Sequence, residues 1–288
     1  MKDISYVLQH FFTHKDFLVP PEQIPGTLFT PLHLVFEAAV LAFIIGFALW
    51  LSRRKEKIRT VLIADWILLL CWEFVIIWWD STQGLHKGID YQAGLSLYPC
   101  SLFLYALPLI IWGKGAWKQM ACGYVFTLGL LGAGINFLYP FSRLQDYSCL
   151  SFPAFHTFTF HGSMLFVFLV LLFSGAHSYR SAGSFRELLY PSVLSMLQSV
   201  PANLLNYTIG ADYMYFRGKI FLMRPLVGHL PEPVVTLMLY VLYLVIPAMF
   251  YLPSYLHRKL SQPREDPDLV DLFAGEKLRF TSFRLPFI

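Results

Sequence analysis

The sequence predicts an all-α fold, a polytopic membrane bundle of about seven transmembrane helices. Hydrophobic residues make up 56% of the chain and charged residues only 14%, whereas a soluble domain carries about 25% charged residues. The mean hydropathy is +0.54. Apolar stretches of roughly twenty residues follow one another, and about 20 helical residues cross a hydrocarbon core of about 30 Å. These observations exclude a soluble globular protein.

The apolar stretches place the predicted spans near 31–51, 60–80, 94–112, 118–139, 158–176, 187–207 and 233–252. Pro191 and Pro201 interrupt the sixth span, and neighbouring helices must then satisfy the carbonyl groups that these prolines free. The spans divide the chain into an extracytoplasmic N-terminal segment (1–30), a transmembrane helical bundle (31–252) and a cytoplasmic tail (253–288).

Lys and Arg residues decide the predicted orientation. Fifteen of the 22 lie in the C-terminal tail and in the loops after the first, third and fifth spans, and seven lie on the opposite side. Because cytoplasmic loops carry the excess of Lys and Arg, we expect the N-terminus outside, the C-terminus in the cytoplasm and a location in the cell (plasma) membrane. The net charge of +4 is small, and it indicates membrane topology rather than nucleic-acid binding.

Polar side chains gather in the outer half of several spans. Asp65, Glu73 and Asp80 are eight and seven residues apart, which places them within an arc of roughly 80° on one helix face. Of these three, Glu73 and Asp80 lie in the outer half of the helix. Further polar residues near the outer ends of spans are Asn136, Ser199, Asn203 and Asn206. We interpret them as a polar cavity open to the outer leaflet. The structural alternative is that Ser199 and the asparagines only join helices through hydrogen bonds, and that Asp65 and Asp80 are interfacial.

Cysteines and histidines supply the candidate reactive groups. Cys71 and Cys122 are interpreted as small apolar fillers, and no pair of cysteines suggests a disulfide. Cys100 differs because it follows Pro99, and because Ser96 lies one turn before it. His161 falls within the predicted fifth span, whereas His156 precedes it. No HExxH or CxxC spacing is present, so we expect no metal and no cofactor.

The run Leu95-Ser96-Leu97-Tyr98-Pro99-Cys100-Ser101-Leu102 resembles the Leu-Pro-Leu-His-Leu-Cys or Pro-Cys-His motif of the YwaF-like integral membrane proteins, which include transmembrane protein 164. Phe160-His161-Gly162 and the segment 206–214 fit the same family, and the resemblance covers roughly residues 30–252. It implies a compact helical bundle, distantly like the androgen-induced-gene hydrolases of fatty-acid esters. It also implies acyl transfer between phospholipids, particularly onto ether-linked lysophosphatidylethanolamine, with Cys100 and His161 as the working pair.

The residues and the resemblance together favour an enzyme of lipid metabolism, an acyltransferase or lipid-ester hydrolase. In this hypothesis His161 takes the thiol proton of Cys100, the thiolate attacks a lipid ester and a thioester forms. Candidates for binding substrate or stabilising the oxyanion are Glu73, Asp80, Ser96, Asn136, Asn203 and Asn206. Arg217, Lys219 and Arg224 stand among aromatic residues in the outer loop of about 208–232, where they would hold a lipid phosphate or only anchor the loop in the interface.

A second hypothesis remains open from the sequence. The protein would then be a non-catalytic carrier or receptor in which Glu73, Asp80 and the asparagines bind a small polar solute. An odd number of spans without an evident inverted repeat argues against most plans of secondary transporters. The expected partners are therefore membrane phospholipids rather than nucleic acid, and the sequence does not indicate an oligomeric state.

Overall fold

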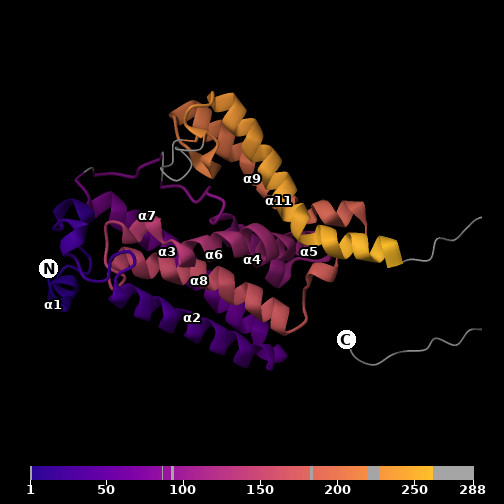
Figure 1. Cartoon of the computed structure of the whole chain (residues 1–288), viewed down its shortest axis with the longest axis horizontal. Coiled ribbons are helices and arrows are strands. Elements are labelled where there is room, and N and C mark those ends of the chain that lie inside the picture. Colours follow the sequence, from indigo (N-terminus) through magenta and orange to yellow (C-terminus); the bar gives the residue numbers. More distant parts are fainter. Residues whose placement is uncertain (1, 86, 92–93, 182–183, 219–226, 262–288) are drawn as a thin grey trace, which may run out of the picture.

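The computed structural model describes residues 2–85, 87–91, 94–181, 184–218 and 227–261. Within these ranges every regular element is helical and no strand is present (Figure 1). The helices are α1 (Ile4–Gln9), α2 (Pro31–Ser52), α3 (Lys55–Gln83), α4 (Leu102–Trp112), α5 (Gly115–Tyr124), α6 (Leu130–Leu138), α7 (Phe141–Leu144), α8 (Phe152–Phe173), α9 (Phe185–Ile209) and α11 (Glu232–Ser261). The predicted all-α class is confirmed.

Five helical stretches in the described part of the chain are long and apolar enough to cross a membrane: Pro31–Ser52, Lys55–Gln83, Gly115–Leu138, Phe152–Phe173 and Glu232–Leu260. They correspond to the first, second, fourth, fifth and seventh predicted spans. The helix α9 forms where the sixth was expected, but it is not among these five. The count of seven spans and the orientation of the termini therefore stay predictions.

The third predicted span, 94–112, is wrong over its first half. Residues 94–101 form turns and bends, and α4 begins only at Leu102. Pro99 has no backbone N–H to donate to a preceding turn and biases Tyr98 away from the helical conformation. The helix α4 has 11 residues and spans about 16 Å. Cys100 consequently lies in the turn that breaks the predicted third span before α4, and not inside a helix.

The stretch from α5 to α6 is one continuous helix interrupted by a π-helical segment. This segment spans Val125–Gly129, and Thr127 inside it donates its hydroxyl to the Gly123 carbonyl at 2.8 Å. A π-bulge widens the helix locally and often accompanies a functional site. It ends three residues before Gly132, which faces Cys100 as described below.

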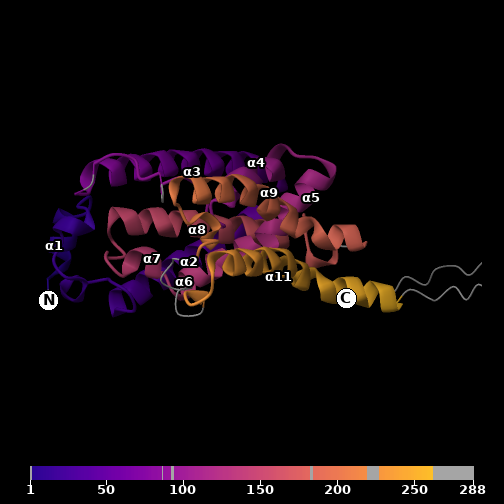
Figure 2. The ribbon, with the colours of Figure 1, turned by 90° about the horizontal axis from the view of Figure 1, so that it is seen from above.

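The helix α8 lies in the middle of the bundle, with α3 and α2 on either side of it in both views (Figures 1 and 2). The rings of Phe36 and Phe47 on α2 pack on those of Phe158 and Phe166 at 5.2 Å in each case. The helices α9 and α11 form a separate pair that projects from this layer (Figure 1). This position brings two polar side chains of α8, His156 and Ser163, against the acidic residues Glu73 and Asp65 of α3.

The N-terminal segment and the start of the predicted tail are both ordered parts of the fold. The N-terminal segment folds over one end of the bundle, where Trp79 Nε1 donates to the Phe12 carbonyl at 2.8 Å and Leu85 N donates to Asp16 Oδ2 at 2.9 Å. The helix α11 continues to Ser261 through Pro253. The beginning of the predicted tail (253–288) is therefore helical, and residues 262–288 lie outside the described residues.

Candidate functional site

Cys100 sits in the turn before α4, against α6. Its carbonyl accepts hydrogen bonds from the backbone N–H of Phe103 at 3.0 Å and from the hydroxyl of Tyr124 at 3.3 Å. A Cβ atom at Gly132 of α6 would lie only 3.0 Å from Cys100 Sγ. The sulfur therefore packs on the α6 backbone at a position that has no room for a side chain.

His161 occupies the middle of α8, and its ring is held by the helix itself. Nδ1 lies 3.0 Å from the Thr157 carbonyl oxygen, one turn earlier. When Nδ1 donates in this bond, it carries the proton of the neutral ring and Nε2 keeps a free lone pair. This tautomer leaves Nε2 ready to accept a proton.

The neighbours of His161 on α8 face the segment that carries Cys100. The ring of Phe160 lies 6.4 Å from that of Phe103, and the Met164 methyl group is 3.7 Å from the same Cβ position of Gly132 that meets Cys100. Among the described residues no hydrogen bond joins Cys100 to His161. The segments that carry Cys100 and His161 therefore meet through Phe103 with Phe160 and through Gly132 with Met164.

Glu73 links the loop before α4 to α8. Its Oε2 accepts from Ser96 Oγ at 2.9 Å, and its Oε1 lies 3.3 Å from His156 Nε2. The side chains of Glu73 and His156 are 16% and 13% exposed. A carboxylate at this depth is costly without a partner. Ser96 and His156, from two different segments, supply hydrogen-bond partners to the Glu73 carboxylate. We call these three residues the Glu73 cluster.

The expectation that only His161 lies inside the helix is wrong, because α8 starts at Phe152 and contains both histidines. Pro153 stands at the beginning of this helix after Ser151, and proline is favoured in a first turn, where its missing N–H leaves no bond unmade. That proline is the signal that would have moved the predicted start. The need of Glu73 for a buried partner would then have identified His156.

The acidic face of α3 is real, and each acid has a partner. Ser163 of α8 donates its hydroxyl to Asp65, and Arg143 Nη2 lies 3.1 Å from Asp80 Oδ2. Asp80 and Arg143 are 40% and 28% exposed. Asp80 therefore forms an ion pair in this structure, and its predicted role in binding substrate stays a prediction.

The three candidate asparagines have different surroundings. Asn206 is committed to the chain, since its Oδ1 accepts from Tyr213 N at 2.7 Å and its Nδ2 donates to the Tyr213 carbonyl at 2.9 Å. Asn203 donates to the hydroxyl of Tyr240, and Ser199 donates to the Met196 carbonyl at 2.6 Å.

Asn136 of α6 is the exception. It is 7% exposed, and its buried Nδ2 has no hydrogen-bond partner among the described residues. It follows Gly132 by four residues, so the two positions share one face of the helix. An unpaired buried donor costs about 1–3 kcal/mol. Asn136 therefore offers a free N–H group one turn from the glycine that contacts Cys100.

The basic residues of the predicted outer loop are only partly described. Arg217 forms a two-pronged ion pair, with Nε and Nη2 each 3.0 Å from an oxygen of Glu232. Its guanidinium is therefore engaged within the chain. Lys219 and Arg224 lie outside the described residues.

The other cysteines differ in exposure. All four cysteines are free. Cys122 is buried as expected, but Cys71 is exposed on α3, so the filler role is wrong for Cys71 because its helix turns it outward. In the described part of the chain no group of three or more His, Cys, Asp or Glu side chains is placed to hold a metal ion.

The fold and the site define a multi-pass helical membrane protein with a cysteine in a helix break beside a histidine-bearing central helix. A family model described as the TMEM164 family matches residues 28–256. The chain therefore belongs to the TMEM164 family, and the match includes Cys100, His161 and the Glu73 cluster. No curated protein and no solved structure matches the chain.

Proposed function

We propose that this protein is an intramembrane acyltransferase of the plasma membrane that moves a fatty acyl group between phospholipids. Cys100 is the nucleophile and His161 is the base. The observation that supports this proposal best is that Cys100 Sγ and the methyl group of Met164, three residues after His161 on α8, meet at the same position of Gly132 on α6. The Nδ1 contact of His161 and the unpaired amide of Asn136 on α6 add to it.

The reaction follows from these three groups. Nε2 of His161 takes the proton of Cys100 as Sγ attacks the ester carbonyl carbon of the donor lipid. The negative oxygen of the tetrahedral intermediate accepts a hydrogen bond from Asn136 Nδ2, which has no other partner to give up. The ester C–O bond then breaks, and the departing lysolipid oxygen takes the proton from His161. A thioester on Cys100 and a neutral lysolipid result.

The second half of the reaction reverses the first with a new acceptor. The hydroxyl of another lysophospholipid gives its proton to His161 and attacks the thioester carbonyl. The C–S bond breaks, and the thiolate recovers the proton from His161. Water in place of the lysolipid would give hydrolysis, so exclusion of water from the site decides between transfer and hydrolysis.

In this proposal the Glu73 cluster holds the two segments that carry Cys100 and His161 in position. Ser96 precedes Cys100 by four residues, and His156 precedes His161 by five. Because Glu73 bonds to both Ser96 and His156, it ties the Cys100 segment to α8. We assign Glu73 a positioning role, since no observation places it against the reacting atoms.

The same contacts disfavour a carrier of small polar solutes. Glu73, Asp80 and Asn206 make bonds within the chain. The large groove between α2, α3 and α8 is lined mainly by apolar residues. Both observations suit a lipid ligand better than a polar one.

The proposal is tested by acyl transfer from a labelled phospholipid to a lysophospholipid in vesicles. Cys100→Ala is expected to reduce transfer to background, because the thioester cannot form. Cys122→Ala is the matched control, since it removes a free thiol elsewhere in the bundle, and it is expected to retain activity. Full transfer by a folded Cys100→Ala protein would remove Cys100 from the mechanism.

A further inference from the structure

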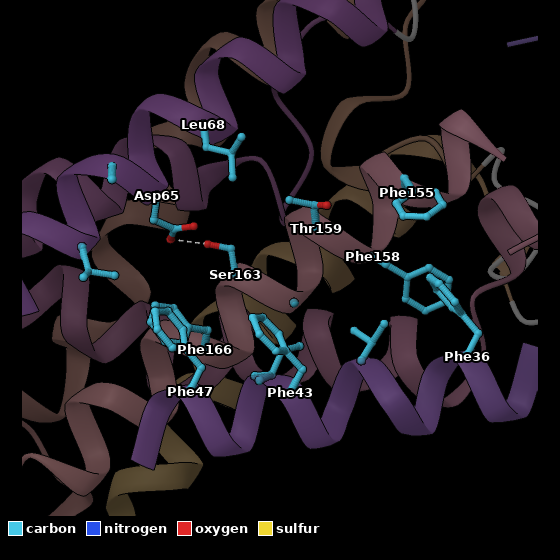
Figure 3. Close-up of a pocket in the computed structure, with 15 residues that line it drawn as sticks. Phe36, Phe43, Phe47, Asp65, Leu68, Phe155, Phe158, Thr159, Ser163 and Phe166 are labelled. Atoms are coloured by element: carbon cyan, nitrogen blue, oxygen red, sulfur yellow. Dashed lines mark hydrogen bonds between the residues drawn. The ribbon is translucent and has the colours of Figure 1, made fainter. Parts of the chain in front are cut away.

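An apolar groove separate from the Cys100 region runs between α2, α3 and α8 (Figure 3). Its volume is about 490 Å³, within the range of about 300–1,000 Å³ that is usual for ligand sites. Phenylalanines dominate its wall: Phe36, Phe43, Phe47, Phe155, Phe158 and Phe166. His161 is not part of this wall, because at 3.6 residues per turn it projects from another side of α8 than Gly162 and Ser163.

The groove is open at the outer surface of the helical bundle. Phe43 on α2 and Leu68 on α3 both line it, and they are 69% and 47% exposed. All three helices that form it are candidate membrane spans. Between Phe155 and Phe166 the groove covers about 16 Å along α8, roughly half of a hydrocarbon core of about 30 Å. These dimensions suit one acyl chain from one leaflet.

Aromatic side chains connect the groove to a charged surface at one end. The ring of Phe47 stacks on that of Phe166 at 5.2 Å and on that of Trp50 at 5.5 Å. The guanidinium of Arg54 lies 4.5 Å from the Trp50 ring centre, and Lys57 Nζ lies 6.0 Å from it. Trp50 therefore lies between the groove wall at Phe47 and these two cations.

These cations belong to a basic cluster at the junction of α2 and α3, composed of Arg53, Arg54, Lys55, Lys57 and Arg59. All five residues are exposed, and none forms an ion pair with a described residue. A cluster of unpaired Lys and Arg next to a membrane helix attracts anionic lipid headgroups. The charge of the cluster thus complements a phosphate at the end of an apolar groove.

A polar pair, Asp65 and Ser163, lies in the mainly apolar wall of the groove. Ser163 donates its hydroxyl to Asp65, and both residues line the groove (Figure 3). The other carboxyl oxygen of Asp65 has no hydrogen-bond partner in the described part of the chain. Asp65 follows Arg59 by six residues, about 9 Å along α3. Polar partners are therefore available just below the headgroup level, where the glycerol esters of a lipid would lie.

We propose that this groove binds one acyl chain of an anionic phospholipid, with the phosphate on the basic cluster and the ester near Asp65 and Ser163. The lipid comes from the leaflet on the side of the basic cluster. The site is distinct from Cys100 and His161, and the inference does not depend on acyl transfer.

The test uses the full-length protein in phosphatidylcholine vesicles that contain a phosphatidylglycerol with a photoreactive diazirine on one acyl chain. After illumination, mass spectrometry maps the labelled peptides. We expect labelling to concentrate on groove residues of α2, α3 and α8. Labelling spread evenly over lipid-facing residues of the whole bundle would overturn the proposal.

A matched pair of variants tests the groove itself. Ala64 is exposed and lines the groove, whereas Ala42 is exposed on α2 but not in the groove wall. Ala64→Trp is expected to lower groove labelling at least fivefold by occupying the space, and Ala42→Trp is expected to leave it unchanged. Equal labelling of the two variants would refute a lipid chain in the groove.

The charged end is tested by Arg54→Gln with Lys57→Gln, both on the surface of the protein. This double variant is expected to reduce labelling by the phosphatidylglycerol probe to that given by a phosphatidylcholine probe. An unchanged preference for phosphatidylglycerol would overturn the role of the cluster. All measurements are repeated with Cys100→Ala, in which groove labelling must persist. Its loss there would contradict the independence of the two sites, whereas failure of acyl transfer alone would leave the groove intact.

Discussion

At the scale of single residues, Asn136 has an unusual position because a buried amide donor without a partner weakens the fold. Its Nδ2 has no partner in the part of the chain that the structure describes, and a buried donor left unpaired costs about 1–3 kcal/mol. A group of this kind persists when a ligand or a transition state uses it. We therefore regard Asn136, rather than Asn203 or Asn206, as the donor to the oxyanion.

Asn136→Leu is predicted to lower kcat by about 10²–10³, the usual effect of losing one oxyanion donor. It is also predicted to leave thermal stability equal or higher, because the variant removes an unpaired donor. Asn206→Leu serves as the contrast, since it breaks two bonds to Tyr213 and should destabilise the fold. Full activity of Asn136→Leu would exclude the proposed role.

A second prediction at the residue scale concerns the close contact between Gly132 and Cys100. A Cβ there would lie 3.0 Å from Cys100 Sγ, whereas a Cβ at Gly134 of the same helix meets nothing within 4 Å. Gly132→Ala should displace the sulfur and slow acyl transfer at least tenfold. Gly134→Ala should leave the rate unchanged and stabilise the helix slightly. Equal rates for both variants would show that the position of the sulfur is not critical.

The sequence indicates candidate reactive residues but not all of their hydrogen-bond partners. Cys100 and His161 were predicted from the motifs around them, and Glu73 was predicted from the cost of a carboxylate in hydrocarbon. His156 was missed because α8 starts six residues earlier than the predicted span at 158. Hydrogen bonds to other segments of the chain decide which asparagine keeps a free donor. A local sequence pattern does not predict such bonds.

At the scale of secondary-structure elements, hydropathy predicts the long helices and fails at the helix break. The apolar run 94–112 contains enough hydrophobic residues for a span. Pro99 and the bonds of Ser96 and Tyr124 nevertheless hold its first half in a turn. Hydropathy averages over these local interactions, so it predicts the presence of an apolar segment but not where its helix begins.

The link between the Cys100 segment and α8 is testable through Glu73. Glu73→Leu leaves Ser96 and His156 without their partner, and we expect it to lower the free energy of unfolding by about 1–3 kcal/mol. Glu73→Gln keeps an acceptor oxygen and should cost less. Reversible unfolding in detergent with a chemical denaturant measures both values. A Glu73→Leu protein as stable as the unmodified chain would show that the cluster does not join these segments.

At the scale of the whole molecule, we expect stability to depend on pH because of His177, which lies in the linker after α8. His177 Nε2 lies 2.8 Å from the hydroxyl of Tyr251 on α11, and burial lowers the pKa of His177 from 6.5 to about 4. A histidine with a lowered pKa in the folded state contributes its full stability above the unfolded value of about 6.5 and loses it as the pH falls toward 4. The attachment of α11 should weaken over that range.

The matched variant is His177→Gln, which cannot take up a proton between pH 6.5 and 4. Its thermal midpoint is expected to fall less over this interval than that of the unmodified protein. Parallel loss of stability in both proteins would assign the pH dependence to other groups.

The overall architecture was predictable from composition because a chain with 56% hydrophobic residues has few alternatives to a membrane helical bundle. The pairing of α9 with α11 and the central place of α8 were not predictable, since several apolar helices of similar length pack equally well in hydrocarbon. Which helices meet is decided by polar pairs such as Ser163 with Asp65, and these become visible only in three dimensions.

The most direct measurement is the mass of the intact protein after incubation with a donor phospholipid and no acceptor. The account predicts one added acyl group on Cys100 that hydroxylamine removes. This group should be absent from Cys100→Ala and form slowly in His161→Ala. Acyl transfer that proceeds at its full rate while Cys100 never carries an acyl group would contradict the account.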